Sequence, residues 1–398
     1  MSGNKHGGAI AILLLTILAG CASAPVETTP VVETPAEPIE PTPEPEPEPP
    51  RGPDPASLRL TIAGVGDMMI GTDYPDNRLP DDDGLGFLAD VAPILSSVDV
   101  AFGNIEGVLL DGGEPAKRCS NPRACYLFRS PSRYAKHFSD AGFDAVSFAN
   151  NHARDFGEEG RLASMQAVAA LGIQHSGLEG DFASWEVNGL KVAMLAFAVT
   201  RNSNMMLDIV PAANTVARIA IDHDVVIVSF HGGAEGLDAL HIPFAAEEYY
   251  NEPRGDVVAF ARAVVDAGAD VVFGHGPHVV RAMENYRGRL IAYSLGNFAT
   301  YYGISVVGLK GVAPILTLTV DGYGKFLDGR IYSTIQRRPA GPSFDDSGRA
   351  YRKMRELSLA DFGEPGIAFA ADGSIAPMPR SFVRSHADVH PADDASDQ

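Results

Sequence analysis

The segment Asp144-Ala-Val-Ser-Phe-Ala-Asn-Asn-His-Ala-Arg-Asp-Phe-Gly157 joins a short, mostly apolar run to a cluster of polar side chains. Residues 145–148 predict a buried strand, because strands covered on both faces of a parallel sheet are nearly continuous apolar runs. A helix is expected directly after the segment, since two glutamates there lead into apolar residues at helical spacing. Asn150, Asn151 and His152 therefore fall at a strand's carboxyl end, where α/β sheets bind ligands. Loop capping by the asparagines is the alternative.

The same arrangement recurs along the chain. Further strands are expected at 58–65, 98–102, 191–198, 225–230, 270–273 and 290–293, with a hairpin turn before the third of these and a helix at about 255–267. Most of these strands end in glycine beside Asp, Asn, Glu or His. The alternation of strands and helices predicts βαβ units, a largely parallel sheet and an α/β fold class. Two antiparallel strands at 312–320 and 328–336 suggest a mixed second sheet or an edge.

Carboxylates and imidazoles gather at these strand ends. The candidate ligands are Asp67, Glu106, His152, His231, His275 and His278. Such a mixed set is typical of a divalent transition metal rather than of calcium. Each histidine could instead be a core or surface residue bonded to the backbone, and that structural interpretation is the one adopted for His175, His223 and His241.

The N-terminus carries an export signal. Lys5 and His6 precede an apolar run at 9–18, which is shorter than the roughly 20 residues of a transmembrane helix, and Leu-Ala-Gly-Cys21 follows. These last four residues resemble a bacterial lipobox, so residues 1–20 are expected to be removed and Cys21 to carry lipid at the periplasmic face of an outer membrane. An ordinary secretory peptide with an incidental cysteine is the alternative.

Residues 21–56 predict a semi-rigid spacer rich in Pro and Glu, because proline favours extended backbone and the carboxylates repel one another. The whole chain has a formal net charge of −20, and the part beyond the spacer remains near −14. This acidity argues against nucleic acid as a partner. The folded domain is expected at 57–338, and residues 339–398 form an extension with one helix near 351–360 and a disordered tail.

Two cysteines remain after Cys21. Cys119 and Cys125 form an even pair with a short intervening loop, which predicts a local disulfide in an oxidising compartment. The alternative of a metal pair lacks further cysteines to complete a tetrahedral set.

Six motifs together resemble the CapA family, the poly-γ-glutamate capsule synthesis proteins. They are Gly66-Asp-Met-Met-Ile-Gly71, Asn104-Ile-Glu106, Ala149-Asn-Asn-His-Ala-Arg-Asp-Phe-Gly157, Val228-Ser-Phe-His-Gly-Gly-Ala-Glu235, His275-Gly-Pro-His278 and Tyr293-Ser-Leu-Gly-Asn-Phe298. The resemblance spans about residues 58–300, with the motifs in the family's order. It implies a layered α/β sandwich similar to the calcineurin-like metallophosphatases, which hold two metals at strand ends.

The resemblance also implies roles for individual residues. Metal ligands would be Asp67, Glu106, Asn151, His231, His275 and His278; catalytic groups would be His152, Asn151 and Glu235; substrate contacts would be Asn104, Asn150 and Asn297. One or two ions of manganese, zinc or iron are expected. The sequence departs from the family at Gly232 and Thr72, where a bulky aromatic and an arginine are usual, and from classical phosphatases at Met69, where they have histidine.

The resulting hypothesis is an envelope lipoprotein that acts as a metal-dependent hydrolase or transferase in capsule or poly-γ-glutamate-type polymer biosynthesis. Its substrate would be an anionic polymer or a phosphorylated glycolipid, and capsule-synthesis proteins would be its partners. The alternatives are a non-catalytic factor for polymer binding, export or attachment, and a metallophosphoesterase on an envelope glycolipid. A purely structural lipoprotein would not require so many polar groups at strand ends.

Overall fold

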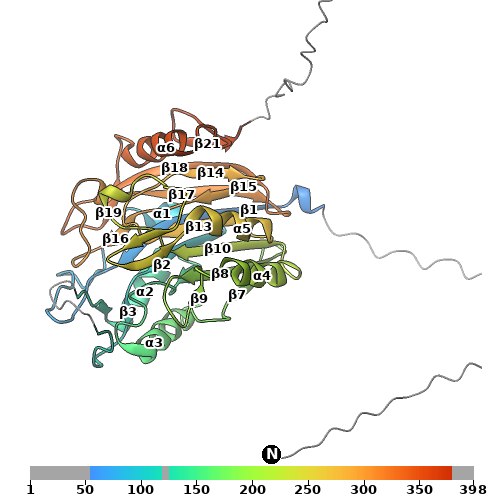
Figure 1. Cartoon of the computed structure of the whole chain (residues 1–398). Coiled ribbons are helices and arrows are strands. Elements are labelled where there is room, and N and C mark those ends of the chain that lie inside the picture. Colours follow the sequence, from blue (N-terminus) through green and yellow to red (C-terminus); the bar gives the residue numbers. More distant parts are fainter. Residues whose placement is uncertain (1–53, 119–124, 379–398) are drawn as a thin grey trace, which may run out of the picture. The chain divides into compact units, whose positions relative to one another are not determined.

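Two large β-sheets carry the fold in this computed structural model, which describes residues 54–118 and 125–378 (Figure 1). The larger sheet has ten strands. Its main order is β20 (Ile367–Phe369), β21 (Ser374–Pro377), β18 (Phe326–Gln336), β17 (Val312–Asp321), β1 (Arg59–Met69), β2 (Val100–Ile105), β5 (Ala145–Ser147) and β6 (Gln174–Ser176); β16 (Asn297–Thr300) pairs with β1 and β19 (Pro342–Phe344) with β18. The strands β1, β2, β5 and β6 are parallel.

The second sheet has seven strands. Its order is β14 (Met283–Tyr286), β15 (Arg289–Ala292), β13 (Val271–His275), β10 (Val225–His231), β8 (Leu190–Ala198) and β7 (Ala183–Val187), with β9 (Asn204–Met205) beside β8. The central strands β15, β13, β10 and β8 are parallel. Two short pairs complete the strands: β3 (Val108–Leu109) with β4 (Arg129–Ser130), and β11 (Glu247–Tyr249) with β12 (Glu252–Gly255).

Helices cover the outer faces of both sheets, except for the last of them, which packs against β14, β17 and β18. They are α1 (Ala92–Leu95), α2 (Ala135–Asp140), α3 (Gly157–Ala169), α4 (Ile209–Ala220), α5 (Val257–Asp266) and α6 (Arg349–Phe362). The helix α5 begins where Asp256 accepts a hydrogen bond from the backbone N–H of Ala259 at 2.9 Å, an N-cap that satisfies an otherwise unpaired donor. It ends before Gly268, whose φ of +113° suits glycine.

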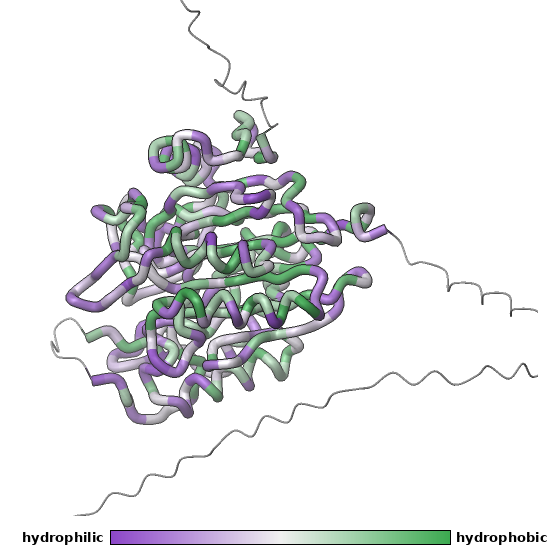
Figure 2. Tube along the Cα trace, turned by 45° about the vertical axis from the view of Figure 1, so that its right-hand side comes forward, coloured by the Kyte–Doolittle hydropathy of each residue, from purple (hydrophilic) through white to green (hydrophobic). Residues whose placement is uncertain are grey.

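The core has three layers, because strand side chains alternate between faces. Along β1, Leu60 and Ile62 point between the two sheets, whereas Ala63 and Val65 pack under α1, α2 and α3. Between the sheets, the rings of Phe102 from β2 and Phe273 from β13 stack with centroids 5.6 Å apart. The third layer joins β8, β10 and β13 to α4 and α5. In the hydropathy-coloured trace, central strands carry long hydrophobic runs, whereas hydrophobic and hydrophilic residues alternate along the helices (Figure 2).

The predicted α/β sandwich is confirmed, and two details go beyond the sequence analysis. The strands β17 and β18 extend the first sheet next to β1, rather than forming a second sheet. The fold also continues past Arg338, since α6 and β21 contribute Met354 and Ile375 to the core between the sheets. The tail beyond 378 lies outside the described residues. No helix within the described part of the chain has the length and apolarity needed to span a bilayer.

The end of β1 packs tightly against the segment that leads into β16. A Cβ atom on Gly66 would lie 1.9 Å from the carbonyl oxygen of Gly296, which is a backbone atom and cannot rotate away. The next residue, Asp67, donates its backbone N–H to that same oxygen at 2.9 Å. Glycine at 66 therefore lets β1 and the segment before β16 meet where the candidate ligands lie.

We expect Gly66→Ala to lower the free energy of unfolding by about 3 kcal/mol or more, the upper range for overpacking a core. Gly86→Ala is the matched control, because Gly86 is exposed and its nearest neighbour would be the flexible carboxylate of Asp82 at 3.3 Å. The control should change stability by less than about 0.5 kcal/mol. Denaturant unfolding followed by circular dichroism measures both. Equal unfolding midpoints for the two variants would contradict this account of the strand contact.

Candidate metal centre

Three buried side chains from both sheets come together at the strand ends. Asp67 lies near the end of β1, Glu106 follows β2, and His231 is the last residue of β10. One potential ligand atom from each lies within 4.8 Å of the others, and all three side chains are buried. Among the described residues, this is the group of carboxylates and imidazoles that could hold a metal ion.

The polar atoms of this group lack protein partners. The buried atoms without a hydrogen bond include Oδ2 of Asp67, both carboxylate oxygens of Glu106, both ring nitrogens of His231 and Oδ1 of Asn151. A buried unpaired polar atom costs about 1–3 kcal/mol and more when charged, so several together require a compensating ligand. A divalent cation fits, since it would accept lone pairs from the carboxylate oxygens and from one ring nitrogen of His231. Carboxylate, imidazole and amide donors without thiolate suit manganese, iron or zinc.

The electrostatics support His231 as a ligand. Complete burial lowers the pKa of its imidazole well below the ordinary value, and the nearby charge of Arg254 acts in the same direction, although Asp67 opposes them. The ring is therefore neutral at physiological pH. Neutral imidazole is the form that binds a metal ion.

Oε1 of Glu106 lies between three imidazoles. It is 3.7 Å from Nε2 of His231, 3.7 Å from Nε2 of His278 and 4.0 Å from Nε2 of His152. These distances are too long for direct hydrogen bonds. They are close to the separation of roughly 3.4 Å between two ligands that each lie about 2.1 Å from one tetrahedral metal. The spacing is thus that of groups arranged around an ion rather than bonded to each other.

His278 lies at the rim of the group with a fixed ring orientation. Its Nδ1 is 2.9 Å from Oδ1 of Asn297 and 3.2 Å from Oδ2 of Asp67, and both of these atoms are acceptors. Nδ1 must therefore carry a proton, which leaves Nε2 facing Glu106. Burial alone would lower the pKa of this ring, but Glu106, Asp67 and Glu235 outweigh it and raise the pKa to about 10. His278 is not one of the three grouped ligands.

The structure does not bring His275 into the group. Its Nε2 donates a hydrogen bond to the carbonyl oxygen of Val65 at 3.0 Å, and Nδ1 lies 3.4 Å from the hydroxyl of Ser229. Both ring nitrogens are thus directed at protein atoms, and the imidazole ties the end of β13 to β1. This differs from its expected role as a metal ligand.

His152 lies beside the group and is oriented by a carboxylate. Its Nδ1 donates to Oδ2 of the fully buried Asp155 at 2.8 Å, so Nε2 points toward Glu106. Lys117 lies 3.2 Å from the other oxygen of Asp155. The ring of Phe128 packs on the imidazole with a centroid separation of 4.2 Å. A histidine held by a buried carboxylate, with its second nitrogen directed at the reaction site, can exchange protons.

Glu235 is held by a buried arginine. Its Oε1 is 3.0 Å from Nη1 of Arg254, whereas its Oε2 lies 3.8 Å from Nε2 of His278. A buried ion pair holds the loop that carries Glu235. In it, Nη1 and Nη2 of Arg281 donate to the two carboxylate oxygens of Glu247 at 2.9 and 2.7 Å. Glu235 thus faces His278 from a rigid loop without joining the three grouped ligands.

Three asparagines expected to contact substrate instead bond within the protein. Nδ2 of Asn104 donates to Oδ1 of Asp67 at 2.9 Å, and Asn150 donates to Oδ1 of Asn104 at 3.1 Å. Asn297 accepts a hydrogen bond from Nδ1 of His278. Its Nδ2 donates another to the backbone oxygen of His278 at 3.2 Å. All three side chains are buried. In the structure Asn104 and Asn297 thus bond to Asp67 and His278, and the expected substrate contacts of the three asparagines stay a prediction.

Asn104→Ala should weaken metal binding about 10- to 100-fold, because it removes the donor that orients Asp67. Asn188→Ala serves as the control, since that amide is exposed and bonds to Asp99 away from the group. Titration calorimetry with manganese compares the two variants. Unchanged affinity in the folded Asn104 variant would show that Asp67 needs no such orientation.

Sequence reasoning missed Asp155, Lys117 and Arg254. Asp155 stands in the quoted segment three residues after His152, and this spacing was its available signal. The other two come from a loop and from β12, with no motif to connect them to the site. Cys125 is disulfide-bonded. Its predicted partner Cys119 and the lipidation candidate Cys21 lie outside the described residues, so that pairing and the lipid anchor stay predictions.

The sequence of this chain is similar to those of known proteins. Residues 61–302 match the family described as bacterial capsule synthesis protein PGA_cap. The capsule biosynthesis protein CapA of Bacillus anthracis is 29% identical over 264 residues, which cover 60% of this chain and 59% of that protein. The PGA biosynthesis protein CapA of Bacillus subtilis (strain 168) is 28% identical over 256 residues, covering 60% and 63%. The chain spans about three fifths of the length of these relatives.

A solved structure described as GAP50, the anchor in the inner membrane complex of Plasmodium, also aligns. Its TM-score is 0.34 at 12% sequence identity, covering 75% of this chain and 95% of that one. Nothing about this chain is concluded from that likeness.

Proposed function

Because this chain belongs to the family of bacterial capsule synthesis proteins, we propose that it acts as a metal-dependent hydrolase or transferase in making a capsular or poly-γ-glutamate-type polymer. The observation that carries the proposal is the buried group of Asp67, Glu106 and His231 with His152 directly beside it. A non-catalytic binding protein would not need an imidazole held by a buried carboxylate at the edge of a metal group.

Each residue of the site would have its own role in such a reaction. Asp67, Glu106 and His231 would hold one divalent ion, which when bound lowers the pKa of water and polarises the scissile carbonyl or phosphoryl oxygen. Asn151 would be a further ligand of this ion through its Oδ1, which has no hydrogen-bond partner. His152 would give or take a proton at Nε2, since Nδ1 is committed to Asp155. Lys117 would hold the carboxylate of Asp155 in place through the contact at 3.2 Å.

A direct assay tests this proposal. The purified protein is incubated with manganese, zinc or iron and with γ-linked glutamyl oligomers, a phosphorylated glycolipid or simple phosphoesters, and product formation is followed by mass spectrometry. We expect cleavage or transfer of a glutamyl amide that stops when the metal is removed by a chelator. Tight polymer binding without turnover under any of these conditions would overturn the enzyme proposal and favour a factor for polymer binding, export or attachment.

The proposal extends to location and partners. Lipid on Cys21 would anchor the protein at the periplasmic face of the outer membrane, and residues 22–56 would separate the domain from that surface, within reach of other capsule-synthesis proteins. Cys21→Ser should then move the protein from the membrane to the soluble fraction, as measured by sedimentation after a salt wash. The wild type should stay with the membrane. A variant that still sediments with membranes would exclude lipid as the anchor.

A further inference from the structure

A cavity of about 260 Å³ lies next to His152, on the side of Phe128. Its lining includes Thr72, Tyr74, Arg78, Phe128 and Tyr302. These residues come from the segment after β1, the segment before β4 and the segment after β16, which the pairing of β16 with β1 brings together. The cavity therefore shares the end of β1 with the metal group.

Phe128 connects this cavity to the candidate catalytic histidine. Its ring packs on His152, with centroids 4.2 Å apart. Its backbone N–H donates at 2.8 Å to Oδ2 of Asp155, the oxygen that also accepts from His152. Met69 and Ile304 pack with Phe128 in a small buried cluster, which holds the ring in place. Phe128 thus both lines the cavity and contacts His152.

The cavity walls combine aromatic faces with a cation. The guanidinium of Arg78 lies 6.0 Å from the ring centre of Tyr302. The carboxylate of Asp76 approaches Arg78 only to 3.9 Å, and both side chains are mostly exposed, at 57% and 76%. An exposed pair of this length contributes little, about 0–1 kcal/mol, so an incoming carboxylate can displace Asp76. Tyr74 packs edge-on against Phe156, which makes its ring a rigid wall.

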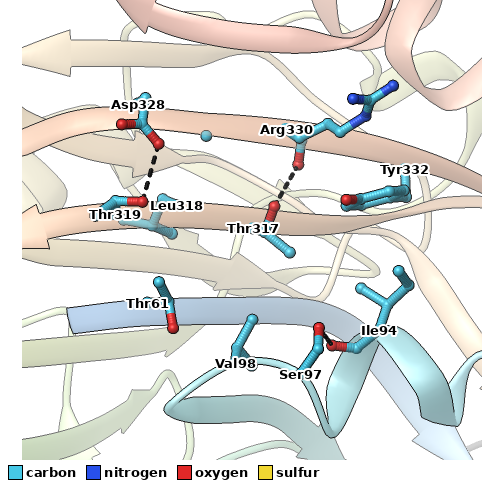
Figure 3. Close-up of a pocket in the computed structure, with 11 residues that line it drawn as sticks. Thr61, Ile94, Ser97, Val98, Thr317, Leu318, Thr319, Asp328, Arg330 and Tyr332 are labelled. Atoms are coloured by element: carbon cyan, nitrogen blue, oxygen red, sulfur yellow. Dashed lines mark hydrogen bonds between the residues drawn. The ribbon is translucent and has the colours of Figure 1, made fainter. Parts of the chain in front are cut away.

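A second cavity, of about 230 Å³, also places a guanidinium over a tyrosine ring, that of Arg330 over Tyr332 at 5.3 Å, but it lies far from the metal group (Figure 3). Its lining residue Thr61 lies six positions before Asp67 on β1, or roughly 20 Å away along the strand. Its polar groups bond to one another, as the hydroxyl of Thr319 does with Asp328 at 2.9 Å. A ligand in this second cavity would therefore not reach His152 or the metal group.

We propose that the cavity beside Phe128 is a subsite for a carboxylate-bearing unit of the polymer, adjacent to the bond that reacts at His152. The aliphatic stem of a glutamyl unit packs between Tyr302 and Phe128, and its carboxylate pairs with Arg78. The position next to His152 rests on the proposed function, whereas the binding itself does not. A guanidinium placed at the rim of an aromatic cavity also explains how an acidic protein attracts an acidic polymer at this point.

The test measures binding of a γ-linked glutamate octamer to the full chain by calorimetry. Arg78→Gln and Tyr302→Ala should each raise the dissociation constant about tenfold or more, as expected for a charge-assisted hydrogen bond and for an aromatic wall. Metal content should not change, because neither side chain contacts the metal group. Arg287→Gln is the matched control, since Arg287 also lies over a tyrosine ring, that of Tyr286 at 5.4 Å, and pairs with an aspartate.

Each outcome decides the proposal. Wild-type affinity in both variants, or no octamer binding by the wild type, would overturn the subsite. Binding of an oligogalacturonate that both variants weaken as much as the glutamate octamer would overturn the glutamyl assignment. A wild type without turnover but with octamer binding that depends on Arg78 and Tyr302 would overturn the enzyme proposal and leave the subsite standing. Turnover on a glutamyl polymer that is unchanged in both variants would overturn the subsite and leave the enzyme proposal standing.

Discussion

Replacing His231 with alanine is expected to weaken metal binding by at least about 100-fold, more than the loss typical of a residue that only supports a ligand. The imidazole is neutral because burial lowers its pKa, and both of its nitrogens lack hydrogen-bond partners. The metal content of the purified protein, measured by mass spectrometry after dialysis against dilute manganese, should fall from about one ion per chain to nearly none.

His275 provides the informative comparison. His275→Gln should keep the metal, because Nε2 already donates to Val65 and the side chain is not among the three grouped ligands. His223→Ala is a neutral control, since His223 bonds to Ser184 at a partly exposed site. Circular dichroism establishes that each variant is folded. If the folded His275 variant lost its metal as completely as the His231 variant, the ligand set assigned from the structure would be wrong.

The same geometry predicts the number of metal ions that one chain binds. A second ion would need ligands such as His275, His278 and Glu235, but His275 is bonded to the backbone and Arg254 already holds Glu235 at 3.0 Å. A fixed guanidinium next to that position opposes a further cation. We therefore expect one ion per chain, which selects between the one and two ions that the sequence left open.

Much of the fold follows from local patterns. The apolar strands and their polar ends are predicted within a few residues, because a buried parallel strand is apolar on both faces and ends where its polar residues begin. The family resemblance that these ends suggested is confirmed. The position of β17 and β18 is harder to predict from the sequence. Their apolar pattern does not show which strand they pair with, and the structure places β17 antiparallel to β1.

The direction of individual side chains could not be predicted. His275 and His231 both end apolar strands, yet one bonds to Val65, 210 residues away in sequence, and the other faces Glu106. Only the packing of one sheet on the other decides this difference. The asparagines behave similarly, because an amide at a strand end suits a substrate, a metal or a neighbouring side chain equally well. Asn104 is directed at Asp67 only because β1 and β2 place these two residues in register.

The second large effect concerns His152. His152→Ala should lower turnover by about 100- to 10,000-fold, the range for a positioned acid or base, while metal content stays near the wild-type value. The reason is geometric: Nε2 lies 4.0 Å from Glu106, beside the grouped ligands, and Nδ1 is held by Asp155. Steady-state kinetics with saturating manganese, together with metal analysis of the same samples, measures both quantities.

Asp155→Asn separates proton transfer from packing. The substitution keeps the shape of the side chain, but its amide can present a donor toward Nδ1, so the imidazole loses the acceptor that fixes its proton. Turnover should fall by a smaller factor than in His152→Ala, about 10- to 100-fold. Asp181→Asn controls for losing a carboxylate elsewhere, since the carboxylate of Asp181 accepts from the backbone N–H of Gly177 at 3.2 Å, away from the metal group. Loss of metal in the His152 variant would make this histidine a ligand and remove it from the proton-transfer role.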